Sequence, residues 1–200
     1  MKNLAKNLVQ FTLVLMLSFS LNAQELTVYV LPSPLDRKWE SPRELISTTL
    51  LNIIYPEKYK KHILGHVFIH LGNGEESFLA GSTTADHIDV KTLTLKSGYG
   101  LGILHSDIPG KLDDPKVLSG ELAARYKHGN ISFMRFKVSE EMYERLKYYL
   151  VEYDRRDYDT IYNGQNKPRE GKGAGCSAFA VSFLEVAGFM KNEWINSWVK

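Results

Sequence analysis

Residues 65–74 (GHVFIHLGNG) carry the clearest structural signal in the chain. Apolar and β-branched side chains dominate residues 62–71, which predicts a central β-strand. The Gly-Asn-Gly sequence at residues 72–74 predicts a tight turn, after which residues 77–80 can return antiparallel as a hairpin. By the period of a strand, His66 and His70 project from one face of it.

Similar patterns place the other predicted elements. Strands are expected over residues 25–31 and 131–138, with further β content over residues 92–95 and 98–105, whereas residues 107–117 are rich in turn signals. One helix is expected after Ser41, which Pro42 and Glu44 follow in the pattern of a capping box, and another after Ser139. A third helix begins at Cys176 and ends at Gly188. The predicted fold class is α+β with a mainly antiparallel sheet.

Composition excludes several classes of protein. The 200 residues are 44% hydrophobic and 24% charged, which is typical of one globular domain. Cys176 is the single cysteine, so an internal disulfide framework and any multi-cysteine zinc or iron–sulfur site are excluded. The formal charge of +2 is too balanced for a nucleic-acid partner.

The N-terminus has the pattern of a secretory signal peptide. Two lysines without an acid precede an apolar run over residues 11–21, and Ala23 offers a small residue for cleavage. The run is too short to span a bilayer comfortably, and a buried N-terminal helix is the alternative. We therefore predict a signal peptide over residues 1–23 and one mature domain over residues 24–200. The mature protein is expected to be secreted or periplasmic, monomeric, and without a stable membrane span.

Cys176 is the candidate nucleophile. It lies in the first turn of a predicted helix, directly after a glycine-rich loop. Free N–H groups and the helix dipole stabilise a thiolate there, and the same N–H groups can hold an oxyanion. Glycines also permit close approach to a substrate. The alternative is an inert thiol packed in the core.

A nucleophilic thiol needs a base, and His66 is the preferred candidate among six histidines because it lies on the most convincing strand. His70 is four residues further along, which separates the two by about 13 Å along a strand. They therefore cannot form a joint catalytic pair, and metal ligation by the two is disfavoured. We expect neither a metal nor a cofactor.

Three motifs together resemble a known family. Residues 176–180 (CSAFA), with Ala-Gly at 187–188, look like the nucleophile helix of NlpC-type cell-wall cysteine peptidases. Residues 162–164 (YNG) resemble the Tyr-x-Gly that precedes the nucleophile, and residues 65–74 resemble the histidine strand and its hairpin. Here the histidine precedes the cysteine, as in the circularly permuted, lecithin retinol acyltransferase-like branch of the papain-like fold. The resemblance covers approximately residues 60–190.

This resemblance implies a papain-like, permuted NlpC-type fold in which an antiparallel sheet packs against the helix carrying Cys176. It implies a cysteine hydrolase in which Cys176 attacks an amide carbonyl and His66 transfers the proton. Tyr162, Ser177 and Gly175 would line the site. The sequence departs from the family pattern at Gly175, where an Asp or Asn is usual.

The residue that orients the histidine is a second departure. Matching the hairpins places Ala80 at that position, and alanine cannot orient an imidazole. Ser82, Glu76 or Asp86 can substitute, and a backbone carbonyl or a water molecule is an equal alternative.

Export and the family together predict cleavage of peptidoglycan peptides. Hydrolysis or transfer of an acyl ester or lipid is the second possibility, because the permuted branch contains acyltransferases. A different class of function is an exported binding module with a decayed site, which Ala80 and Gly175 favour.

Overall fold

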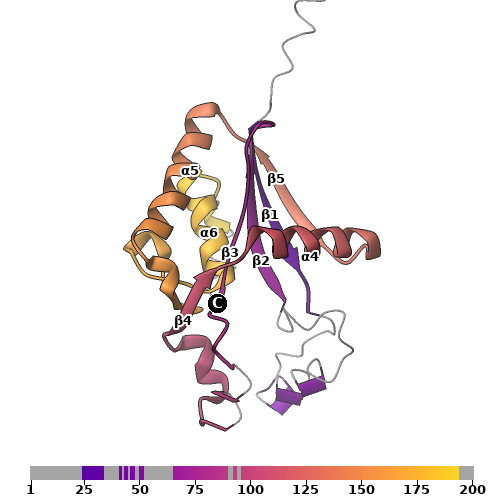
Figure 1. Ribbon diagram of the computed structural model, residues 1–200, viewed down its shortest axis with the longest axis vertical. Coiled ribbons are helices and arrows are strands. Elements are labelled where there is room, and N and C mark those ends of the chain that lie inside the picture. Colours follow the sequence, from indigo (N-terminus) through magenta and orange to yellow (C-terminus); the bar gives the residue numbers. More distant parts are fainter. Residues whose placement is uncertain are drawn as a thin grey trace, which may run out of the picture.

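The computed structural model of the chain describes residues 24–33, 41, 43–44, 46–47, 50–51, 65–89, 92–93 and 96–193. Its centre is a six-stranded sheet in the order β5-β1-β2-β3-β4-β6, in which every pair of neighbouring strands is antiparallel. Helices cover both faces of this sheet (Figure 1). The strands are β1 (Glu25–Leu31), β2 (His66–Gly72), β3 (Ser77–Thr84), β4 (Ile108–Leu112), β5 (Ser132–Lys137) and β6 (Ile161–Tyr162).

The predicted hairpin is confirmed as β2 and β3. Asn73 forms its turn by accepting hydrogen bonds from the backbone N–H groups of Glu75 and Glu76. The strands pair with His70 opposite Leu79 and Phe68 opposite Gly81. β1 pairs with the other edge of β2, so that β2 is a central strand, as its apolar composition predicts.

One face of the sheet packs against α5 (Glu140–Arg155) and α6 (Cys176–Val186) (Figure 1). Both helices start where the sequence predicts: the Ser139 side chain accepts a hydrogen bond from Met142 N–H, and α6 begins at Cys176. Gly188 follows α6 with φ +70°, a left-handed conformation that ends the helix. The main core lies between these helices and the sheet and contains Leu26, Val28, Ile69, Leu71, Ala80, Tyr143, Leu146, Tyr153, Phe179 and Phe183.

The other face is crossed by α4 (Pro115–His128). Leu118 of this helix packs with Tyr29, Leu31 and Phe68 in a second, smaller core. The expectation of a turn-rich segment over residues 107–117 is wrong, because β4 and the start of α4 occupy it. Asp114 is the N-cap of α4, and the proline after it takes the first helical position, so these turn-forming residues start a helix.

The β content expected over residues 92–95 and 98–105 is also wrong where the structure describes these residues. Asp89 accepts hydrogen bonds from the backbone N–H and the hydroxyl of Thr92, which starts a helical turn there. A 3₁₀-helix, η2 (Gly100–His105), follows. Local side-chain capping therefore overrides the β-branched composition. Within the described part of the chain, no helix is both long enough and apolar enough to cross a membrane.

Candidate active site

Cys176 is half-buried at the first position of α6, as predicted. The loop before it is fixed by the backbone N–H of Gly175, which donates to Asn163 O at 2.7 Å. Ser82 on β3 adds a hydrogen bond of 2.6 Å from its hydroxyl to Ala174 O. The backbone directly before Cys176 is therefore held by short hydrogen bonds both to the sheet, at Ser82, and to the segment that follows β6, at Asn163.

The glycines before Cys176 pack closely against neighbouring backbone. A Cβ at Gly173 would lie 2.1 Å from Tyr158 O and 2.2 Å from Ile161 O, and a Cβ at Gly175 would lie 3.1 Å from Gly164 Cα. These two glycines therefore make room for the chain's own backbone.

His66 is the first residue of β2 and is buried. Its Nε2 lies 2.8 Å from Oδ2 of Asp113, which is also buried. Because a carboxylate only accepts, Nε2 carries the proton, and Nδ1 is the nitrogen left to exchange a proton with the thiol.

Gly81 makes the His66–Asp113 contact possible. Asp113 directly follows β4, and its N–H donates to Gly81 O on β3 at 2.9 Å. The histidine on β2 therefore reaches across β3 to its carboxylate. A Cβ at Gly81 would lie 2.6 Å from Asp113 Oδ2 and 2.9 Å from His66 Nε2, so any larger residue would occupy the space where the two side chains meet.

The thiol and the imidazole perturb each other. Burial lowers the pKa of His66, but the hydrogen bonds with Asp113 and Cys176 outweigh it and raise the pKa to about 9. Burial raises the pKa of Cys176, but the hydrogen bond and positive charge of His66, with smaller contributions from Val67 N–H and Tyr162, lower it overall. These directions favour a thiolate–imidazolium pair near neutral pH.

The predicted site-lining residues lie around this pair. The Tyr162 hydroxyl on β6 is 3.8 Å from Cys176 Sγ. Burial raises the pKa of Tyr162, and the neighbouring thiol raises it further, so the phenol stays protonated and can donate to sulfur. Ser177 is exposed in the first turn of α6. Gly175 is the N-cap residue of this helix.

The three residues predicted as alternatives for orienting His66 have other contacts. Ser82 binds the loop before Cys176, as described above. Glu76 pairs with Lys147 of α5, and Asp86 pairs with Lys111 of β4 at 2.5 Å. Asp113 occupies the position beside His66 in their place.

Asp113 is not predicted from the sequence. It stands in an Asp-Asp-Pro sequence that is typical of a turn, and no motif marks it as functional. The available signal is Gly81, an isolated glycine within a strand, which indicates a close approach of another group. That signal gives the location of the contact but does not identify the residue that makes it.

Comparison with known proteins adds no relative: no family model, curated protein or solved structure matches the chain.

Proposed function

We propose that this chain is an exported cysteine hydrolase of the permuted papain-like type, with Cys176 as nucleophile, His66 as general acid and base, and Asp113 as the residue that orients His66. The observation that carries the proposal is the contact of one buried imidazole with both a carboxylate at 2.8 Å and the thiol. Two of these residues lie 110 positions apart, and packing a core does not require them to meet.

The residues support a complete reaction. The Cys176 thiolate attacks the carbonyl carbon of an amide, and the His66 imidazolium gives its Nδ1 proton to the leaving amine, which leaves a thioester. Neutral His66 then accepts a proton from water as that water attacks the thioester. The acid is released, and the thiolate–imidazolium pair is restored. Asp113 holds the ring in its tautomer throughout.

Peptidoglycan peptides are the proposed substrate, from the resemblance to cell-wall peptidases and from the predicted signal peptide over residues 1–23, which lie outside the described residues. Acyl esters and lipids are the second substrate class. A decayed binding module is less well supported, since a carboxylate–imidazole–thiol arrangement with a lowered cysteine pKa is what activity requires.

The test is incubation of the mature protein, from residue 24, with purified muropeptides and separately with acyl esters, beside the Cys176→Ala variant. Product from muropeptides that disappears in the variant supports the peptidase assignment. Product from esters alone moves the assignment to the acyl class. If neither substrate is turned over and iodoacetamide alkylates Cys176 no faster than it alkylates a free thiol, the enzyme proposal is wrong.

A further inference from the structure

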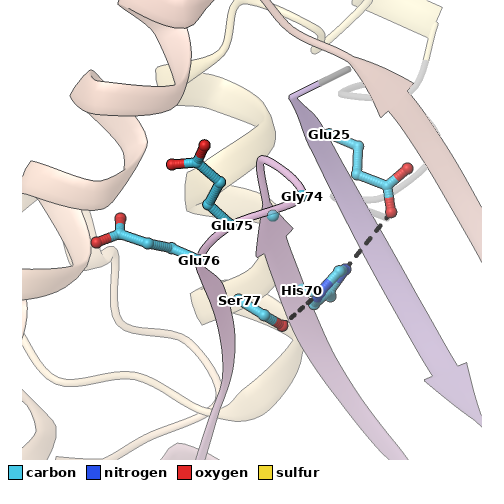
Figure 2. Close-up of a pocket in the computed structure, with 7 residues that line it drawn as sticks. Glu25, His70, Gly74, Glu75, Glu76 and Ser77 are labelled. Carbon is cyan, nitrogen blue, oxygen red and sulfur yellow. Dashed lines mark hydrogen bonds and ion pairs between the residues drawn. The ribbon is translucent and has the colours of Figure 1, made fainter. Parts of the chain in front are cut away.

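The opposite end of β2 carries a cavity of about 340 Å³ beside the β2–β3 hairpin (Figure 2). Cys176, His66 and Asp113 do not line it. Its walls come from β1, β2, β3 and the hairpin turn: Glu25, His70, Gly72, Gly74, Glu75, Glu76 and Ser77.

Three of these residues form a line of polar contacts across adjacent strands. His70 Nε2 lies 2.9 Å from Ser77 Oγ, and His70 Nδ1 lies 3.6 Å from Glu25 Oε1. Figure 2 shows the imidazole between the hydroxyl and the carboxylate, with one contact at each nitrogen. A hydroxyl hydrogen-bonded to Nε2 and a carboxylate on the Nδ1 side is the order of groups in a serine–histidine–acid triad, although Nδ1 itself forms no hydrogen bond here. The carboxylate distance is long, as such contacts often are before a substrate binds.

Neighbouring residues set this geometry. A Cβ at Gly72 would lie 3.0 Å from His70 Cε1, so the glycine leaves room for the ring to lean over the hairpin toward Ser77. Arg135 of β5 holds the other oxygen of Glu25, with 3.5 Å between its Nε and Glu25 Oε2. Ser77 itself is exposed, so its hydroxyl is accessible from solvent.

We propose that Ser77, His70 and Glu25 form a second nucleophilic centre, independent of Cys176, that is acylated on Ser77 by small esters without negative charge. Ser77 Oγ attacks the ester carbonyl carbon, its proton passes to His70 Nε2, and the proton then goes to the departing alcohol. Water, deprotonated by the same nitrogen, attacks the acyl-serine, and the proton passes from Nε2 to Ser77 Oγ as the acid is released. Glu25 orients the ring and stabilises its cationic form.

The charges around the cavity define the substrate class. Lys147 pairs with Glu76 and Arg135 pairs with Glu25, so the exposed Glu75 leaves the rim with a net negative charge, which disfavours an anionic ligand. Burial lowers the pKa of His70, while Glu25 of β1 raises it and Arg135 of β5 lowers it further. The ring is therefore neutral at pH 7, and Nε2 can accept the serine proton.

The test uses the Cys176→Ala protein, so that the first site cannot contribute. A fluorophosphonate probe is added, and the labelled residue is identified by peptide mass spectrometry. We expect Ser77 to react, and His70→Gln to slow the reaction by about a hundredfold, in the range of a lost general base. Ser132 on β5, which is also exposed on a strand, is the matched control serine.

A second measurement keeps the test independent of the folding of His70→Gln. In the Cys176→Ala background, Ser77→Cys and Ser132→Cys are alkylated with iodoacetamide over a range of pH. A thiol at position 77 should react faster than one at 132 at neutral pH, and Glu25→Gln should reduce the difference. Labelling of Ser77 no faster than of Ser132, together with equal alkylation of the two thiols, would falsify the second centre. Either result leaves the role of Cys176 unaffected.

Discussion

Each end of β2 carries a histidine next to a carboxylate, but the surroundings of the two histidines differ. His66 and His70 lie on one strand, and each has a carboxylate within reach, at 2.8 Å from Asp113 and 3.6 Å from Glu25. Yet the pKa of His66 is raised to about 9, and that of His70 is lowered. Burial lowers both values, so the difference comes from the groups that compensate for it.

At His66 two hydrogen-bonded partners, Asp113 and Cys176, both stabilise the imidazolium. At His70 a single carboxylate acts at longer range, and the cation of Arg135 opposes it. One end of the strand is thus arranged to hold a charged imidazole and the other a neutral one. The first suits an ion pair with a thiolate, and the second suits a base for a hydroxyl.

The largest expected effect separates the two histidines. His66→Ala removes the group that lowers the pKa of Cys176, so that burial of the thiol dominates and its pKa rises. Alkylation by iodoacetamide near pH 6 should slow on the order of a hundredfold, the size of effect expected when a nucleophile loses its base, because only the thiolate reacts. His70→Ala should leave this rate unchanged. Equal rates in the two variants across the pH range would mean that His66 and Cys176 do not form a pair.

A smaller effect is expected from filling the space beside each ring. Gly81→Ala places a methyl group between the buried His66 and Asp113 and should cost about 1–3 kcal/mol of unfolding free energy. Gly72→Ala meets only the half-buried His70 ring, which can swing aside, and should cost less than about 1 kcal/mol. Urea denaturation measures both.

Gly120→Ala is the matched control for these two variants. A Cβ there meets no atom within 4 Å, and the residue lies inside α4, so alanine should stabilise the protein by roughly 0.5–1 kcal/mol through helix propensity. If Gly81→Ala behaves like this control, the space beside His66 is not needed for its contact with Asp113.

The last effect is a pH dependence of stability. The folded-state pKa of His66 lies above the ordinary value of 6.5, so its contribution to stability is fully present below pH 6.5 and is lost as the pH rises through about 9. Asp113→Asn weakens that contribution. The difference in unfolding free energy between wild type and variant should therefore be largest below pH 6.5 and should shrink toward pH 9.

Each unit by which the variant lowers the pKa of His66 corresponds to about 1.4 kcal/mol of that difference at low pH. Denaturant titrations at several pH values measure it, and NMR titration of the His66 ring gives the pKa directly. A difference that is constant with pH would show that Asp113 acts on packing alone and not on the charge of His66.

The sequence by itself determined the elements whose signals are local. The hairpin from His66 to Thr84 follows from β-branched residues around a Gly-Asn-Gly turn, and α5 and α6 follow from Ser139 and the glycines around Cys176. It also favoured Cys176 and His66, because helix-terminal thiols and strand-borne imidazoles have recognisable surroundings. The prediction of turns over residues 107–117 was wrong because Asp and Pro, which form turns, also start helices.

Only the tertiary structure decided which groups meet. Asp113 reaches His66 across β3 because Gly81 has no side chain. Strand pairing brings these three residues together, and the local sequence around each of them does not predict that pairing. Ser77 and Glu25 likewise meet His70 only through the register of β1 and β3 on β2. Local sequence sets propensities over a few residues, whereas a catalytic arrangement depends on contacts between distant segments that form only when the sheet assembles.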